Sequence, residues 1–247
     1  MDKKLGFCNL HQGRPFFKYA VEAIYPQVDK IFIFYTDTPS QGYKTPLECP
    51  DKRQELYDDI KPFMDKVTWI DGHWDTEGEH VDAVRAHTKG CEWLVRFDAD
   101  EIYQPGSVDY FVKQAEKTTF KDFRVPMFHF WRSFNWVCRD AQFPFRLERL
   151  RGATGWGWLS DEDDKYKIIH MGYAQPTNYI KYKMQVSAHK PEWRPNWYGD
   201  CWLSNAKDNI HPVSYIPNPL WNAEPFDKTK LPEVLKNHEY YDKEIIE

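Results

Sequence analysis

The segment Trp93-Leu94-Val95-Arg96-Phe97-Asp98-Ala99-Asp100-Glu101 joins an apolar run to an acidic block, and it is the most informative part of this sequence for the fold. Its first half is apolar apart from one arginine and predicts a buried strand over 92–97. Its second half is an Asp-x-Asp-Glu block that follows this strand without a break. Because ligands of open parallel sheets bind beyond the carboxyl ends of the strands, we expect this block to face a binding site.

Outward from this stretch, apolar runs alternate with segments of helical periodicity. Further strands are predicted at 5–8, 30–35 and 67–70, and helices at 14–24, 53–64, 76–88 and 107–115. Thr76 and Glu79 have the spacing of a capping box, and Pro15 lies where a first helical turn accepts proline. The alternation predicts an α/β fold with a doubly wound, mostly parallel sheet and right-handed connections.

The second half of the chain has a different pattern. After about residue 120, short strands are predicted at 123–131 and 143–150, followed by irregular Trp- and Pro-rich segments and a helix from residue 232. No internal repeat and no clear linker is present in the sequence. We therefore expect one domain over 1–247 with an elaborated C-terminal half.

The composition limits the class of protein. Aromatic residues make up 17% of the chain, which excludes a disordered protein, because disordered chains lack the side chains that form a core. Aromatic-rich polar chains are common among sugar-binding proteins, although additional core tryptophans produce the same composition. The net charge is −5 and only residues 146–151 are locally basic, so a nucleic-acid partner is not indicated.

The cysteines and the N-terminus bear on the compartment. The five cysteines form no C-x-x-C pair, so neither a zinc knuckle nor a disulfide framework is indicated, and reduced thiols are expected. Met1-Asp2-Lys3-Lys4 leads into a strand-like segment without the apolar region of a signal peptide. No apolar run is long enough to span a bilayer. We expect a soluble, cytoplasmic protein.

The carboxylates of the Asp-x-Asp-Glu block suggest metal chemistry. Asp98, Asp100 and Glu101 repel one another at this spacing, and a nearby cation would relieve the repulsion. Oxygen-rich clusters suit hard ions such as Mg²⁺ or Mn²⁺. Such an ion can bridge a diphosphate and neutralise the charge that grows on it as a leaving group. A solvated acidic turn after the strand is the structural alternative.

The order of elements together with the Trp93–Glu101 stretch resembles a GT-A glycosyltransferase, and more narrowly the family 2-like group with a W-hydrophobic-x-x-D-x-D-E signature. Weaker matches are Arg146-Leu147, 169–173 and His211-Pro212. The resemblance implies a GT-A fold and transfer of a sugar from a UDP- or GDP-sugar to a hydroxyl acceptor with Mn²⁺ or Mg²⁺. Residues 1–120 would bind the nucleotide sugar and 121–247 the acceptor. The usual Asn-Glu dipeptide after the first strand is Asn9-Leu10 here.

The resemblance also implies roles for single residues. Metal ligands would be Asp98, Asp100 and the late histidine His170, with His189 and His211 as weaker substitutes. Nucleotide-sugar contacts would come from Asn9, Asp37, Arg85 and Asp98, the last through metal or ribose, and from Lys181 or Lys183. The structural alternatives are a loop-capping role for Asp37, a surface helix charge for Arg85 and an ordinary strand-end residue for His170.

The acceptor side is less defined. An inverting transferase needs a carboxylate that takes the proton of the acceptor hydroxyl. Asp161 and Glu162 are the candidates, because they follow the aromatic Trp156-Gly157-Trp158, although an acidic surface loop explains them equally. A retaining enzyme needs no such base. Among acceptors a glycan is favoured, while a lipid-linked sugar, a protein and a modified nucleobase stay open.

Two other functions are consistent with the sequence. A nucleotidyltransferase on a related sheet usually begins with a Gly-rich phosphate loop, whereas 5–9 contains a single glycine. A non-catalytic carbohydrate-binding protein would use tryptophans as stacking platforms and need neither metal nor nucleotide. Its candidate platforms are Trp156, Trp158, Trp193 and Trp197.

Overall fold

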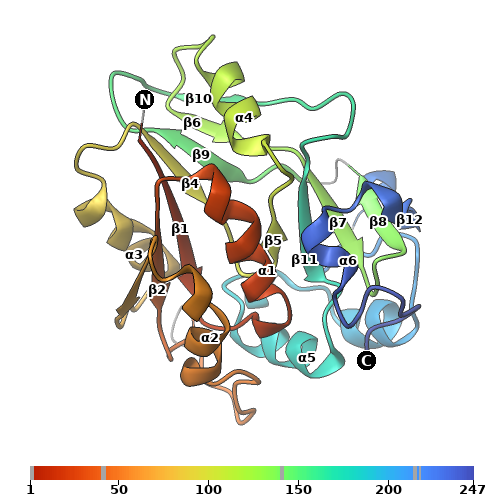
Figure 1. The fold of residues 1–247 in the computed structure, drawn as a ribbon. Coiled ribbons are helices and arrows are strands. Elements are labelled where there is room, and N and C mark those ends of the chain that lie inside the picture. Colours follow the sequence, from red (N-terminus) through yellow and green to blue (C-terminus); the bar gives the residue numbers. More distant parts are fainter. Residues whose placement is uncertain (1–2, 40–42, 140–141, 214–215, 217) are drawn as a thin grey trace.

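A seven-stranded sheet forms the centre of the protein (Figure 1). The computed structural model describes residues 3–39, 43–139, 142–213, 216 and 218–247. The strand order is β10-β6-β9-β4-β1-β2-β3. The bounds are β1 Lys4–Leu10, β2 Lys30–Tyr35, β3 Val67–Asp71, β4 Trp93–Arg96, β6 Asp122–Arg124, β9 Phe145–Arg149 and β10 Trp156–Trp158. β3, β2, β1 and β4 are parallel neighbours, β9 is antiparallel to both β4 and β6, and β10 is parallel to β6.

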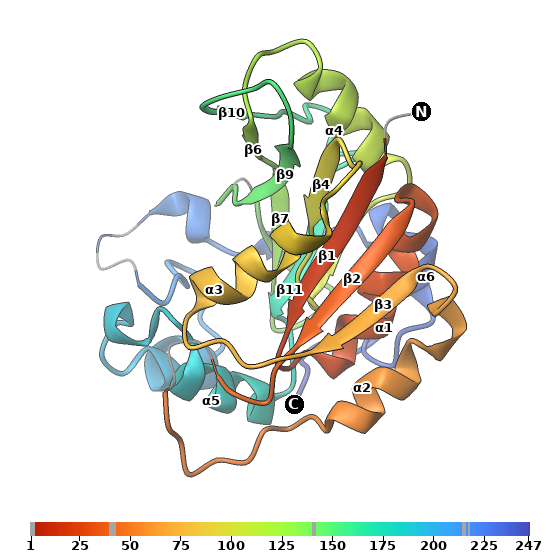
Figure 2. The same ribbon diagram turned by 90° about the vertical axis from the view of Figure 1, so that its left-hand side faces the viewer.

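Helices cover both faces of the parallel part of this sheet. Along β2, Ile31 and Ile33 pack with α1 (Arg14–Ile24) and α4 (Ser107–Ala115). Phe32 and Phe34 point the other way, toward α3 (Glu77–Asp82) and η4 (Ala83–His87). Figure 2 shows α3 on the opposite side of the sheet from α1. The continuous apolar run of β2 follows from this two-sided cover, since both faces of the strand are buried.

The loop between β1 and α1 is fixed against the Asp-x-Asp block. Gly13 has φ of 136°, a backbone conformation that L side chains rarely adopt, and a Cβ added to it would lie 2.4 Å from the Cβ of Ala99. The carboxylate of Asp51 accepts hydrogen bonds from the backbone N–H groups of Gly13 and Arg14 at 2.6 and 3.0 Å. Asp51 thus caps α1 from a distant part of the chain.

A second sheet begins where the Asp-x-Asp-Glu block ends. Its strand order is β12-β8-β7-β11-β5. The bounds are β5 Glu101–Ile102, β7 Met127–Trp131, β8 Trp136–Arg139, β11 Ile168–Tyr173 and β12 Glu224–Pro225. β11 pairs parallel with β7 and antiparallel with β5, and α5 (Thr177–Val186) follows it. The C-terminal half is therefore joined to the block through β5.

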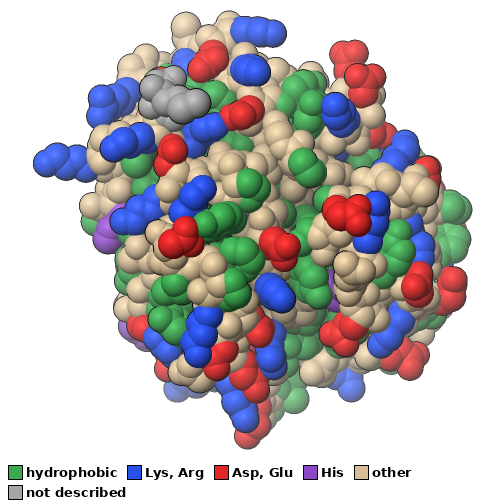
Figure 3. All heavy atoms as spheres, in the orientation of Figure 1, with side chains coloured by type: hydrophobic (Ala, Val, Ile, Leu, Met, Phe, Trp, Pro, Cys, Tyr) green, Lys and Arg blue, Asp and Glu red, His purple; other side chains and the backbone are tan. Residues whose placement is uncertain are grey.

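The remaining elements are short. Their bounds are α2 Arg53–Asp59, α6 Glu233–Lys236, η1 Tyr25–Gln27, η3 Lys61–Phe63, η5 Lys190–Glu192, η6 Tyr198–Leu203, η7 Pro219–Trp221 and η8 Lys228–Lys230. Within the described ranges, no helix is long and apolar enough to cross a membrane. Acidic and basic side chains are interspersed on the face drawn in Figure 3.

The α/β class, the mostly parallel sheet of the first half and the elaborated second half are confirmed. Several boundaries differ from the prediction. The helix predicted over 53–64 ends at Asp59, because Pro62 has no N–H to donate to the carbonyl of Asp58. The strand predicted over 123–131 is divided at Val125-Pro126 into β6 and β7, which belong to different sheets. The single-domain assignment stays a prediction.

Candidate active site

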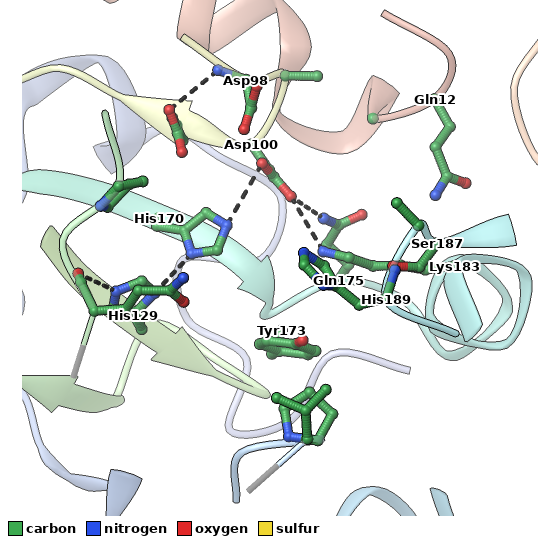
Figure 4. A pocket seen from close by; sticks show the side chains of 18 of the residues that line it. Gln12, Asp98, Asp100, His129, His170, Tyr173, Gln175, Lys183, Ser187 and His189 are labelled. Carbon is green, nitrogen blue, oxygen red and sulfur yellow. Dashed lines mark hydrogen bonds and ion pairs between the residues drawn. The ribbon is translucent and has the colours of Figure 1, made fainter. Parts of the chain in front are cut away.

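A cavity of about 560 Å³ lies at the carboxyl ends of β1 and β4, between the two sheets and α5. Its lining combines the Asp-x-Asp-Glu block, polar groups of the β1–α1 loop, and histidine and aromatic side chains of the second half. The residues used below are Asn9, Gln12, Asp98, Asp100, Glu101, His129, Arg146, His170, Tyr173, Gln175, Lys183, Glu192, Trp193, His211 and Trp221. Figure 4 shows His170 between Asp100 and His129, with Gln175 and Lys183 directed toward Asp100.

Two of the three carboxylates are paired with one arginine from β9. Arg146 donates to Glu101 at 2.7 and 2.5 Å and to Asp98 at 2.6 Å. Glu101 is 1% exposed, so this paired geometry is required for its charge to be tolerated. Burial alone would raise the pKa of Asp98, but the guanidinium groups of Arg146 and Arg96 lower it to about 2. The cation expected beside the block is thus partly supplied by the protein.

Asp100 has a different environment. Among the described residues no arginine pairs with it; its carboxylate accepts a hydrogen bond from Gln175 at 2.9 Å and lies 3.8 Å from the ammonium group of Lys183. Burial raises the pKa of the Asp100 carboxyl above its ordinary value, and the charge of Lys183 opposes this shift. Asp100 is therefore the carboxylate of the block that is least compensated within the protein.

His170 faces Asp100 from β11. Its register opposite Glu101 of β5 and His129 of β7 fixes its backbone, and its Nε2 atom lies 3.7 Å from a carboxylate oxygen of Asp100. The ring has room because the next residue on the same face is Gly172, where a Cβ would lie 2.4 Å from Nε2. Burial lowers the pKa of His170 to about 3, and the charges of Lys183 and Arg146 act in the same direction. The imidazole is neutral at physiological pH.

A hydrogen-bond chain determines which nitrogen of His170 carries the proton. Nε2 of His129 lies 3.0 Å from the backbone carbonyl of Gln142, which can only accept, so His129 donates from Nε2. Burial lowers the pKa of His129 to about 3, so this ring is also neutral and its Nδ1 accepts. The Nδ1 atoms of His129 and His170 are 2.9 Å apart, and His170 must be the donor. The lone pair of His170 Nε2 therefore faces Asp100.

Asp100 and His170 together fit a divalent cation. A carboxylate oxygen and a nitrogen lone pair face each other at 3.7 Å, and a cation between them would remove their repulsion. Oxygen with neutral imidazole nitrogen is a donor set that suits Mn²⁺ and similar ions. Among the residues the structure describes, no group of three or more His, Cys, Asp or Glu side chains has the arrangement of a metal site. The remaining ligands would have to come from substrate and water.

Several polar atoms on the cavity wall have no partner in the described part of the chain. Both side-chain polar atoms of Asn9 are buried and unpaired, as are Oε1 of Gln12, Nε1 of Trp193 and Nδ1 of His211. Buried polar groups are normally hydrogen-bonded, because each unmade bond costs about 1–3 kcal/mol. These atoms thus indicate a ligand or ordered water with several polar groups of its own.

Another part of the wall is aromatic. Tyr173, Trp193 and Trp221 line it, and the ring of His211 lies 4.1 Å from that of Trp221. A cavity with carboxylates in one region and aromatic rings in another can accommodate a charged group and an apolar or sugar face together.

Five of the catalytic, metal-binding and nucleotide-contact residues predicted from the sequence do not line the cavity, and Lys181, exposed on α5, is one of them. Asp37 is exposed in the loop after β2, where it accepts a hydrogen bond from Thr38. Arg85 pairs with Glu148 at 2.7 Å on the α3 side of the sheet. Asp161 is buried and accepts from the backbone N–H groups of Tyr166 and Lys167.

Glu162 is exposed beside Asp161. In this loop, Tyr166 stacks on Tyr110 of α4 with ring centroids 4.2 Å apart. The structure brings neither Asp161 nor Glu162 to the cavity. It does bring together Asn9, the neighbouring Asp98 and Asp100, and His170, three parts of the chain that lie far apart in the sequence.

Sequence analysis missed the roles of Arg146, His129 and Gln175. Arg146 was noted as part of a basic run and, with Leu147, as a weak match to the family, and neither observation indicates that it reaches the Asp-x-Asp-Glu block. His129 lies within an apolar strand, and a histidine there is more often a core residue. Pairing of β9 with β4, and of β11 with β7 and β5, creates these contacts, and no local pattern in the sequence reports that pairing.

No family model and no curated protein matches this chain. Among solved structures, S. aureus TarS 1-349 has a TM-score of 0.45 and 7% identity over 82% of this chain and 76% of its own. S. aureus TarS has a TM-score of 0.44 and 8% identity, and the match covers 76% of this chain and 39% of TarS. The 4-diphosphocytidyl-2C-methyl-D-erythritol synthase of Anaerococcus prevotii has a TM-score of 0.39 and 8% identity, and the match covers 60% of this chain and 70% of the synthase. At TM-scores this low, these likenesses support no particular activity.

Proposed function

We propose that this protein is a metal-dependent glycosyltransferase of the GT-A type, similar to the family 2-like group, which transfers a sugar from a nucleotide-diphosphate sugar to a hydroxyl acceptor. The observation that carries the proposal is the pair Asp100 and His170, whose electron-rich atoms face each other at 3.7 Å in the cavity beyond the parallel strands. A catalytic metal needs such an incomplete set of protein ligands, because substrate must supply the others.

Asp100 and His170 would hold the divalent cation. When bound, this cation would supply positive charge beside the diphosphate leaving group. Lys183, on α5 and close to Asp100, is placed to contact the same phosphates. Asp98 is held by Arg146, so we assign it to the ribose or to a water ligand of the cation rather than to the inner ligand set. The unpaired atoms of Asn9 and Gln12 are available for the nucleoside.

The acceptor would bind at the aromatic region of the cavity. Tyr173, Trp193 and Trp221 offer ring surfaces there. Apart from the Asp-x-Asp-Glu block, the carboxylates on the described wall are Glu77 and Glu192. Glu192 precedes Trp193 and lies 3.1 Å from the ring of His189, so we propose it, in place of Asp161 or Glu162, as the group that takes the proton of the acceptor hydroxyl.

The first test is binding of UDP and GDP measured by calorimetry with and without Mn²⁺, followed by hydrolysis of a panel of nucleotide sugars. We expect metal-dependent nucleotide binding and hydrolysis of one donor. Asp100→Asn should abolish both, whereas Asp75→Asn, at a carboxylate whose side chain is 83% exposed outside the cavity, should change neither. Absence of nucleotide binding in the presence of metal would contradict the proposal.

The two alternatives predict other results in the same experiment. A nucleotidyltransferase would bind a nucleoside triphosphate and release pyrophosphate, whereas a carbohydrate-binding protein would bind sugar without metal or nucleotide. The β1–α1 loop disfavours the first, because Gly13 is the only glycine of residues 9–13 and its space is filled by Ala99.

A further inference from the structure

Two tryptophans of β10 leave their indole rings in solvent. Trp156 and Trp158 are 51% and 59% exposed, and they lie on the same face of the strand because they are two residues apart. Gly157 between them faces the other way, where a Cβ would lie 2.5 Å from the ring of Phe120. The strand is thus backed by Phe120 and presents both indoles outward.

An arginine holds these rings in place. Arg124 of β6 is directly opposite Trp158 and Phe145 in the strand register. Its guanidinium carbon lies 4.3, 5.2 and 5.7 Å from the ring centroids of Phe145, Trp158 and Trp156. Its Nη1 donates to the carbonyl of Phe143 at 2.8 Å. We call Phe143, Phe145, Trp156 and Trp158 around Arg124 the aromatic platform. Cation–π contacts and strand pairing fix it before any ligand binds.

Core packing does not account for the aromatic platform. β10 is the edge strand of the seven-stranded sheet, so no described strand pairs with its outer edge. Burial of an aromatic ring stabilises a fold relative to its exposure, so adjacent exposed tryptophans are costly to leave in water. Contiguous exposed apolar surface of this kind usually marks a binding site.

The aromatic platform shares a segment of chain with the cavity. Gln142, Pro144 and Arg146 line the cavity, while the intervening Phe143 and Phe145 belong to the platform. Alternate residues of this segment therefore serve the two surfaces. A chain-like ligand that leaves the cavity across this segment reaches the aromatic platform.

The ring geometry selects among chain-like ligands. Trp156 and Trp158 are inclined by 69° with centroids 6.0 Å apart, so one flat nucleobase cannot stack on both. Successive pyranose units of a glycan are rotated relative to one another, and each can place its C–H face on a differently oriented ring. The net charge of −5 disfavours a strongly anionic polymer.

We propose that the aromatic platform is a glycan-binding site outside the cavity, which holds the distal units of an extended neutral acceptor while the cavity holds its reacting end. That this glycan is the acceptor of a transfer reaction rests on the proposed function, whereas binding of the glycan does not require transfer. The platform contributes affinity for long chains and leaves donor chemistry unchanged.

The test compares binding of short and long cello-, malto- and chito-oligosaccharides to the wild type and to W156A/W158A by calorimetry. We expect the wild type to bind the long chains of one series, and the double variant to bind them at least about tenfold more weakly, equivalent to about 1.4 kcal/mol. Trp158→Phe, which keeps a ring, should retain most of the affinity. Leu203→Ala is the matched control, because Leu203 is also 59% exposed and lies outside the platform.

Three results would overturn the inference: no binding of any oligosaccharide by the wild type, equal affinity in W156A/W158A, or self-association that the double variant abolishes without any glycan binding. The last result would make the platform an interface between copies of the chain. Donor hydrolysis separates this inference from the proposed function. If the wild type hydrolyses no nucleotide sugar but binds a glycan, and the double variant does not bind that glycan, the proposed function is refuted and the glycan-binding role of the aromatic platform is supported.

Discussion

Replacing Arg146 by methionine removes the charge that compensates two carboxylates while keeping most of the side-chain volume. Glu101, which is 1% exposed, loses hydrogen bonds of 2.7 and 2.5 Å. Breaking a buried ion pair from one side costs about 3–5 kcal/mol, because the remaining charge stays buried without a partner. Asp98 adds little, since 31% of its side chain reaches solvent. We therefore expect Arg146→Met to lower the free energy of unfolding by about 3–5 kcal/mol.

Urea denaturation followed by tryptophan fluorescence measures this change. Arg85→Met is the matched control: Arg85 also pairs with a glutamate, at 2.7 Å, but its side chain is 43% exposed, so a loss of about 0–1 kcal/mol is expected. The double variant E101Q/R146M removes the buried charge together with its partner and should recover most of the stability. The reasoning is refuted if Arg146→Met costs no more than Arg85→Met, or if the second substitution restores nothing.

Three further predictions concern the site and its support. His129→Phe removes the acceptor that keeps the proton on Nδ1 of His170. The affinity for Mn²⁺, measured by calorimetry in the presence of nucleotide, should fall about 10–100-fold while the fold is retained. Unchanged affinity would exclude the tautomer assignment. Gly172→Ala places a Cβ 2.4 Å from His170 Nε2 and should weaken Mn²⁺ binding. Overpacking should also lower the free energy of unfolding by about 1–3 kcal/mol. A variant with normal metal binding would show that the His170 ring moves freely. Asp51→Ala removes the cap of α1 and should cost about 0.5–2 kcal/mol in urea denaturation, and a neutral result would mean that water replaces the carboxylate.

The first half of the fold could be predicted from local sequence signals, because each of its elements is specified by residues close together in the chain. The apolar run of β2 requires burial on both faces, Pro15 fits the first turn of α1, and Thr76 caps α3 by accepting from Glu79 N–H. The strand that ends on Asp98 likewise placed the carboxylates at the end of a buried strand. In the second half, local signals were ambiguous: the apolar run through Pro126 was predicted as one strand, and α5 was not predicted.

Tertiary structure alone decided which charges meet. Arg146 reaches Asp98 and Glu101 through the antiparallel pairing of β9 with β4, across 48 and 45 residues of chain. His170 meets Asp100 because β11 pairs with β5, and its protonation is set by His129 on the strand at its other side. Such contacts depend on which strands become neighbours, and hydrophobic periodicity reports only that a strand exists and which face it buries. The sequence thus supplied the carboxylates of the candidate site, and the sheet pairing decided that Arg146 compensates Asp98 and Glu101 but does not pair with Asp100.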